Sequence, residues 1–519
     1  MNKTNIKLMI FVCGIFICML DTTVMNVALP QISESFSLPL NNLSWALNIY
    51  TILFASLTIP LTRVAEKFGM NRILLLGFII FGLGSLISGD ANELIILVAG
   101  RAIQSLGAAL VFPLSMTLGI NLVSTDKRTG VIALLGVTQG LAAALGPVIG
   151  GIITQFLNWR WIFFINIPII LFALIIGYIM FDFTEHQFQN QAFDVLGSSL
   201  SILFLLSLTT FLTQGRSWGW TSTTSTLFIF ASVIFFILFV LQELHTKNPM
   251  IPLKLFKNRN FNGAAVVIIL SNLFLVAVTV ILPTYYTNVK NYDSLNASFM
   301  LIPITLLIFI MSPIAGFSLN KLGPRVLLTI GFTLMIIGYV GYSQNGLESQ
   351  VYSCLYGAFV GAGYGLITGP ITVIAASDFE GEMLSASQSV SGVLRQVGTV
   401  LAVSIFVTGL YSNLDNAQHN SEHYVQKKVM KMYLPPKVKS TLVKKSNEGI
   451  ESNKNTKLPT EHTGNREIDA YINKTLRDIK KTANSNVVDA FKNLYRSSVP
   501  FIFGIIILTI FYWRKKNNN

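Results

Sequence analysis

The chain has 519 residues, of which 52% are hydrophobic and only 12% are charged, and its formal net charge is +13. Soluble proteins carry about 25% charged residues, so a soluble multidomain enzyme is excluded and an all-α polytopic membrane protein is expected. The excess of Lys and Arg falls between apolar segments, where the positive-inside rule explains it better than nucleic-acid binding. The sequence has no GxxxxGK[ST] motif and no CxxC, so we expect no ATPase, no metal site and no cofactor.

In chain order, the apolar segments predict fourteen transmembrane helices. A helix needs about 20 residues to cross about 30 Å of hydrocarbon. No signal-peptide cleavage site follows the first segment, so we expect it to be a retained span. The last segment is the weakest, with about 15 apolar residues where about 17 are wanted. The segments lie at 8–29, 44–62, 73–90, 94–120, 131–157, 161–181, 195–213, 224–242, 262–284, 298–319, 326–343, 350–374, 391–411 and 499–513.

The distribution of basic residues predicts the orientation. With both termini inside, the inner loops and termini carry 16 Lys and Arg, whereas the short outer loops carry 3. Cytoplasmic loops are enriched in Lys and Arg, so we expect both termini in the cytoplasm. The aromatic and basic end of the last span, from Phe511 to Lys516, fits that orientation. The 412–498 segment holds 16 further Lys and Arg but is predicted to be extracellular, because long loops translocate largely regardless of charge.

The 412–498 segment is polar and rich in Lys and Asn, a composition typical of disorder. Within it, five apolar residues follow helical spacing, with basic residues on the opposite face. They could form a helix on the outer membrane surface or over the substrate exit. We expect disorder or a solvated helix for most of the segment. The five residues are Ile468, Tyr471, Ile472, Leu476 and Ile479.

An internal repeat divides the chain. The sequences KFGMNRILLLGF (67–78) and KLGPRVLLTIGF (321–332) correspond at an offset of 254 residues. The first joins spans 2 and 3 and the second joins spans 10 and 11, so spans 1–6 correspond to spans 9–14, with two spans inserted between them. Two parallel six-helix halves are the plan of a transporter that rocks around a central site.

The repeat predicts a 6+2+6 organisation. Residues 1–190 would form the N-terminal six-helix half and residues 191–250 the two inserted helices. Residues 251–519 would form the C-terminal half, including the long extracellular loop at 412–498 before the last span.

Asp21 is the one acidic residue that the prediction places within a span. It stands halfway along the first span, in LDTTVMNVALP (20–30). A charged Asp at the bilayer centre costs about 2.5–3.5 kcal/mol, so such a residue usually faces a cavity and has a function. Burial also disfavours the charged form of a carboxyl, so a buried Asp can take up and release a proton. The alternative is a structural hydrogen bond to Thr22, Asn26 or a neighbouring helix.

Two arginines also lie within predicted spans. Arg101 is in the first half of span 4, and its guanidinium keeps its proton, so inside a bundle it must pair with an acid, a carbonyl or water. Asp21 is an available partner, and the alternative is that Arg101 reaches an interface. Arg395 lies nearer the end of its span, where we expect it to extend to the interface.

The fifth span carries a dense block of small residues, GVTQGLAAALGPVIGG (136–151). Glycines four residues apart let helices approach closely, and a proline supplies a fixed bend. Ordinary packing explains each glycine but not the whole Gly-Pro-x-x-Gly-Gly block, which comprises Gly146, Pro147, Gly150 and Gly151.

At these residues the chain resembles the drug:proton antiporters of the major facilitator superfamily, in the fourteen-span branch of quaternary-ammonium and multidrug exporters. The first-span signature LDxTVxNVALP matches throughout, and the fifth-span signature G-P-x-x-G-G is intact. The signature of the loop between spans 2 and 3 is degenerate in TRVAEKFGMNR (62–72). It keeps Gly69 and Arg72 but has Glu66 in place of Asp. The span 4 signature R-x-x-Q-G appears as RAIQS, with Ser105 in place of Gly.

The resemblance implies a monomeric, proton-driven exporter in a bacterial plasma membrane. It implies that Asp21 and Arg101 act in proton coupling, and that Glu66, Gly69 and Arg72 form an inner gate. We expect Glu66 to pair with Arg72 or with the start of span 11.

We expect the substrate to be a small, amphipathic and cationic molecule, with monocations exported better than dications because only one intramembrane acid is available. The alternative is an exporter of an endogenous lipid, siderophore or metabolite. A non-transporting sensor is disfavoured because it needs neither a duplicated bundle nor a buried acid.

Overall fold

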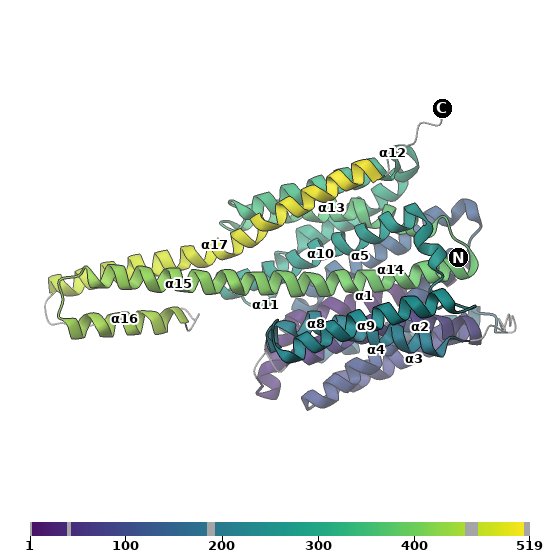
Figure 1. Cartoon of the computed structure of the whole chain (residues 1–519), viewed down its shortest axis with the longest axis horizontal. Helices are drawn as coiled ribbons and strands as arrows, with labels where there is room; N and C mark the ends of the chain where they lie inside the picture. Colours follow the sequence, from purple (N-terminus) through teal and green to yellow (C-terminus); the bar gives the residue numbers. More distant parts are fainter. Residues whose placement is uncertain (1–2, 39–42, 184–192, 452–465, 513–519) are drawn as a thin grey trace.

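The computed structural model describes residues 3–38, 43–183, 193–451 and 466–512. Within these ranges the regular elements are all helices, most of which run along one long axis (Figure 1). This confirms the all-α fold class. The elements are α1 (Lys3–Phe36), α2 (Ser44–Phe68), α3 (Met70–Gly89), α4 (Leu94–Asn121), α5 (Thr125–Phe156), α6 (Trp161–Phe164), α7 (Asn166–Met180), α8 (Val195–Trp218), α9 (Thr223–His245), the 3-10 helix η2 (Leu253–Lys257), α10 (Arg259–Asn288), α11 (Ser294–Phe299), α12 (Ile302–Ser343), α13 (Gln350–Ala376), α14 (Gly381–Ala402), the π-helix η3 (Val403–Val407), α15 (Thr408–Met430), α16 (Pro436–Glu451) and α17 (Arg466–Tyr512).

Thirteen helical segments of the described ranges are long and apolar enough to cross a membrane. The fourteenth predicted span forms the end of α17, which packs against α12 and buries Ile502 and Ile505. The predicted cytoplasmic end of this span, from Trp513 to Lys516, lies outside the described residues. A count of fourteen spans therefore remains a prediction.

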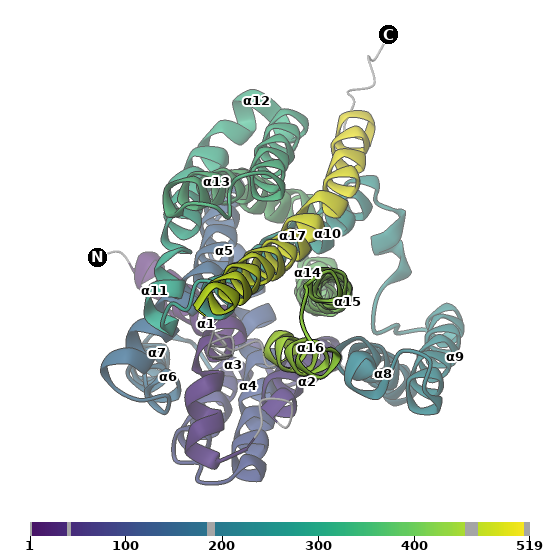
Figure 2. The same cartoon turned by 90° about the vertical axis from the view of Figure 1, so that its left-hand side faces the viewer.

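The helices form two groups that meet along α5 and α14 (Figure 2). Helix α5 contacts α1 and α4 of the first group and also α12 and α13 of the second, whereas α14 contacts α2 and α4 across the interface as well as α10. Helices α8 and α9 lie at the edge of the bundle, with α8 against α2 (Figure 2). The predicted boundary at residues 190/191 lies outside the described residues, and the 6+2+6 division remains a prediction.

The two copies of the repeat share a backbone feature. Gly69, between α2 and α3, has φ +100°, and Gly323, 254 residues later, has φ +73°. Positive φ is readily adopted by glycine alone. At Gly323 this conformation interrupts α12, so the predicted spans 10 and 11 form one long element with a kink between them. The repeated glycine therefore makes an equivalent turn in both copies.

Of the two alternatives expected for most of residues 412–498, disorder or a solvated helix, the described part of that segment is helical. Helix α14 continues through η3 into α15, and α15, α16 and the first part of α17 extend beyond one end of the bundle (Figure 1). Of the predicted apolar face, Ile472, Leu476 and Ile479 pack within this extension, whereas Tyr471 is 51% exposed. The buried apolar core of the extension comprises Val425, Val429, Met432, Leu442, Ile472, Leu476 and Ile479.

Candidate functional site

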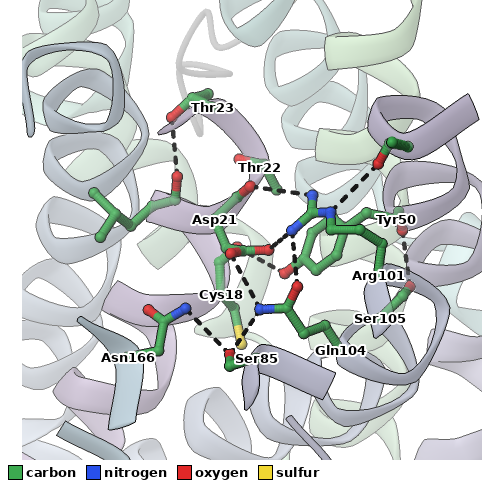
Figure 3. A network of polar contacts seen from close by, with 12 residues as sticks. Cys18, Asp21, Thr22, Thr23, Tyr50, Ser85, Arg101, Gln104, Ser105 and Asn166 are labelled. Carbon is green, nitrogen blue, oxygen red and sulfur yellow. Dashed lines mark hydrogen bonds and ion pairs between the residues drawn. The ribbon is translucent and has the colours of Figure 1, made fainter. Parts of the chain in front are cut away.

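Asp21 and Arg101 meet inside the first group of helices (Figure 3). Asp21 on α1 and Arg101 on α4 are each 1% exposed. Arg101 Nη1 pairs with Asp21 Oδ2, and Gln104 Nε2 donates to Asp21 Oδ1 at 3.3 Å. The alternative that Arg101 reaches an interface is therefore wrong. The structure brings together the acid and the cation that the sequence left as possible partners.

Three further residues, which sequence reasoning missed, enclose this pair (Figure 3). The Arg101 guanidinium lies 4.3 Å from the ring centre of Tyr50, a cation–π contact. Ser85 Oγ accepts from Gln104 Nε2 at 2.7 Å and from Asn166 Nδ2 at 3.3 Å. Apart from the pair itself, the only member of this network that belonged to a motif noted in the sequence was Gln104, one helical turn after Arg101. The resulting network spans α1, α2, α3, α4 and α7.

The Gly-Pro block of α5 lies against α1 just after Asp21. Pro147 has no N–H, so the carbonyl of Ala143, four residues earlier, lacks its helical donor. Thr23 Oγ1 donates to that carbonyl at 2.9 Å. A Cβ on Gly146 would overlap Thr23 Oγ1, and a Cβ on Gly150 would lie 2.7 Å from the Val24 carbonyl oxygen. The motif therefore fixes α5 to α1 two residues from the carboxylate.

The opposite side of α5 faces the second group of helices. A Cβ on Gly136 would lie 2.8 Å from Thr372 Oγ1, and one on Gly140 would lie 2.9 Å from the ring of Tyr364, both on α13. Gly151, the last residue of the block, is buried. Small residues thus let α5 pack closely between α1 and α13.

The predicted inner-gate acid has a different partner from the one expected. Glu66 Oε2 pairs with Arg63 Nη1 at 2.7 Å, and the same nitrogen lies 2.5 Å from Glu382 Oε1 in the first turn of α14. Arg63 and Glu66 are three residues apart and share one face of α2. Arg72 lies beyond the Gly69 turn and donates to the Phe183 carbonyl at 2.8 Å. The expectation of an Arg72 or span 11 partner is therefore wrong.

A second ion pair also joins the two groups of helices. Arg128 on α5 lies 2.9 Å from Glu380, the residue that precedes α14. Together with Arg63, Glu66 and Glu382 (the Arg63 cluster), it ties α2 and α5 to the beginning of α14. Sequence reasoning missed Glu380 and Glu382, although their acidic side chains at a helix N-terminus were a usable signal.

Asp21 is not the only acid buried among the spans. Glu243 near the end of α9 is 4% exposed and accepts hydrogen bonds from the backbone N–H groups of Met250 and Ile251, both at 3.0 Å. The Met250 carbonyl in turn accepts from Arg63 Nε at 2.9 Å. The prediction missed Glu243 because it stands one residue beyond the expected end of its span. This acid therefore orders the loop that contacts Arg63.

Arg395 is buried between the helix groups, with 4% exposure, so the expectation that it reaches an interface is wrong. Its Nη2 donates to Thr372 Oγ1 at 2.9 Å. It lines a closed cleft, here called the central cavity, in which the described side chains leave no room for a water molecule in this structure. Helices α4 and α5 contribute to it on one side and α10, α13 and α14 on the other. The lining residues are Phe112, Gln139, Ile268, Thr372, Ala375, Gln388, Ser391, Gly392 and Arg395.

The two groups of helices meet around the central cavity and each contains a copy of the repeated turn. A comparison of the sequence with protein-family profiles agrees with this architecture. The profile of the Major Facilitator Superfamily matches residues 11–403. The chain belongs to the major facilitator superfamily. It is therefore a multi-pass membrane transporter. The match ends within η3, so α15, α16 and α17 lie beyond it.

Curated relatives of the chain include transporters with different names. The riboflavin transporter RibZ of Clostridioides difficile is 28% identical over 437 residues, which cover 82% of this chain and 93% of that protein. The probable multidrug resistance protein EmrY of Escherichia coli is 29% identical over 409 residues, or 78% of this chain and 80% of that protein. The multidrug resistance protein Stp of Mycobacterium tuberculosis is 26% identical over 410 residues, or 78% and 76%.

A solved structure supports the fold. The proton:xylose symporter XylE matches with a TM-score of 0.55 and 14% identity, over 78% of this chain and 88% of that chain. At this identity the match supports the major-facilitator fold alone. The predicted family resemblance is confirmed, and multidrug exporters are among the relatives.

Proposed function

We propose that the chain is a proton-coupled exporter of amphipathic small molecules in a bacterial plasma membrane, acting as a monomer. The observation that carries this proposal is the buried pair of Asp21 and Arg101 beside the α1–α5 contact. Burying two charges costs several kcal/mol per ion before their attraction is counted, so a pair of this kind inside a transporter suggests a role in transport. The relatives EmrY and Stp are named as multidrug resistance proteins, which supports export of drugs.

In this proposal Asp21 takes up the proton. Protonation removes the negative charge that faces Arg101 and weakens the link between α1 and α4. Because Thr23 holds α1 to α5, and α5 contacts α13, a shift of α1 is transmitted to the interface between the halves. Opening at the predicted cytoplasmic end then requires the Arg63 cluster and the Arg128–Glu380 pair to separate. Release of the proton restores the Asp21–Arg101 pair.

The charge of the substrate is a separate question. The sequence favoured cations because Asp21 could serve as their counter-ion, but both carboxylate oxygens of Asp21 have partners within the protein. A cationic substrate remains a prediction from sequence. The name of RibZ, together with the amide groups of Gln139 and Gln388 in the central cavity, favours as a second candidate an uncharged, hydrogen-bonding metabolite such as a flavin.

A substrate panel in inverted vesicles with an imposed pH gradient tests the proposed function. We expect at least one amphipathic compound to accumulate in vesicles whose lumen is acidic, because the outward proton flow drives uptake in this orientation. A protonophore should abolish the accumulation. Vesicles that carry empty vector provide the background. Accumulation that persists after the pH gradient and the membrane potential are removed would contradict proton coupling.

Neutralising the acids of the Arg63 cluster should open the predicted cytoplasmic end. The reporter is Ser389→Cys, because Ser389 lies beside Arg63 and Glu66. In Glu66→Gln and Glu382→Gln we expect this cysteine to react about 3- to 5-fold faster with a cytoplasmic thiol reagent. A partly exposed ion pair contributes up to about 1 kcal/mol, so its loss should raise the population of the open state by about that factor.

Glu348→Gln is the matched control, since this acid pairs with Lys492 at 3.0 Å in a predicted outer loop. The labelling rate of this variant should stay at the wild-type value. Equal rates in all three variants would remove Glu66 and Glu382 from the gate.

A further inference from the structure

The central cavity is lined by a buried cation, Arg395, that has no acidic partner in the part of the chain that the structure describes. Arg395 is 4% exposed, and its guanidinium keeps its charge at any physiological pH. Among the described residues no carboxylate lies within ion-pair distance of it, and the side chains it interacts with are the neutral hydroxyls of Thr372 and Tyr364. Arg101, the other arginine buried within the spans, has Asp21. Burying a charge without a counter-ion costs free energy. A bound anion would therefore stabilise Arg395, because the described residues supply no counter-ion.

Some polar atoms around Arg395 also lack hydrogen-bond partners in the described structure. Thr372 Oγ1 donates to the Thr368 carbonyl at 2.8 Å while it accepts from Arg395, so this hydroxyl's one proton is already used. By contrast, Gln139 Oε1 and Ser391 Oγ are buried without a hydrogen-bond partner in the described structure. Both residues line the central cavity together with Arg395. Buried polar atoms normally have partners, so a polar molecule that enters when the two groups of helices move apart would complete this set.

The rest of the lining fits an amphipathic molecule. Phe112 on α4 and Ile268 on α10 provide apolar surface, and none of the nine lining side chains is acidic. A planar guanidinium binds a carboxylate through two parallel hydrogen bonds. The cavity thus offers an anion site next to an aromatic and an aliphatic side chain.

We infer that Arg395 is a specificity-determining residue that binds an acidic group, a carboxylate, on an amphipathic aromatic substrate. This inference deepens the proposed function and rests on it for the direction of transport. It also predicts the electrical behaviour. Export of an anion and entry of a proton both move positive charge inward, so an inside-negative membrane potential should accelerate transport of the acid.

Binding to the purified full-length protein tests the inference without any transport step. The probes are rhodamine dyes that carry a free carboxylate and the ethyl esters of the same dyes, followed by fluorescence polarisation. Each pair differs in the carboxylate alone. We expect the acids to bind at least about 10-fold more tightly than their esters. The reason is that a hydrogen bond between charged groups contributes more binding free energy than one between neutral groups.

The variants identify the residue responsible. Arg395→Gln should weaken binding of the acids about 10- to 100-fold and change binding of the esters less than about 2-fold. Arg395→Lys retains the buried cation, so it is less disruptive to folding, and should weaken binding of the acids by an intermediate factor. The matched control is Arg496→Gln, an exposed arginine on α17, which should leave both affinities unchanged.

Two results would overturn the inference. One is that no acid of the panel binds more tightly than its ester. The other is that Arg395→Gln or Arg395→Lys, while remaining monodisperse, lowers acid and ester binding equally. If the acids bind through Arg395 but no dye responds to a pH gradient in vesicles, the anion site stands and the proposed proton coupling fails.

Discussion

Asp21→Asn is expected to abolish uphill transport while the protein still reaches the membrane. Asparagine keeps the size of the side chain and can hydrogen-bond to Gln104, but it cannot carry the proton. We expect concentrative uptake in inverted vesicles to fall about 100-fold or more, to the level set by passive leak, since one whole step of the cycle is lost. Downhill exchange of substrate against substrate, which needs no net proton movement, should persist.

The single variant also leaves Arg101 buried without its counter-ion, and breaking such a pair costs about 3–5 kcal/mol. Loss of transport could then reflect misfolding. The double variant Asp21→Asn with Arg101→Gln removes both charges, so its thermal stability should recover toward the wild-type value while uphill transport stays absent. If either variant still concentrates substrate, a group other than Asp21 carries the proton.

Gly146→Ala is expected to reduce transport at least 10-fold by separating α5 from α1. The added Cβ would overlap Thr23 Oγ1 and approach the Val24 nitrogen to 3.0 Å. Overpacking of this kind costs about 1–3 kcal/mol. It would also push Thr23 away from the Ala143 carbonyl, which Pro147 leaves without a helical donor. The measurement is the initial rate of pH-driven uptake, together with the unfolding temperature of the purified protein.

The same helix provides the control. Gly130 on α5 has no heavy atom within 4 Å of an added Cβ, and alanine raises helix propensity relative to glycine by about 1 kcal/mol. Gly130→Ala should therefore keep full transport and unfold at the same or a slightly higher temperature. Wild-type transport by Gly146→Ala would show that α1 and α5 tolerate separation and that the motif does not act through this contact.

The elements that could be predicted from the sequence are those that depend on local patterns. Apolar runs defined the spans because each helix must satisfy its own backbone in the bilayer. The repeated Gly69 and Gly323 were recognisable because the positive φ needed at the same place in each copy strongly favours glycine. Asp21 stood out because placing an acid inside an apolar run costs free energy, so such a residue usually has a function.

Tertiary structure alone decided which groups meet. Glu66 pairs with Arg63 on its own helix and through it reaches Glu382, 316 positions later in the chain, whereas the sequence suggested other partners. The sequence placed Arg395 near enough to a span end to reach water, yet the packing of α14 against α10 and across to α4 leaves it buried.

In the region of α15, α16 and the first part of α17, the sequence indicated a helix only through the apolar spacing of residues 468–479, and what this face packs against was beyond sequence reasoning. The composition of these helices resembles that of a disordered segment, because few of their residues are apolar. Those few lie on facing sides of separate helices and form one small core only when the chain folds back on itself. Composition and spacing thus determined which residues are in the membrane and which of them are costly there. The partners of those residues depended on helix faces far apart in the sequence, which only packing brings together.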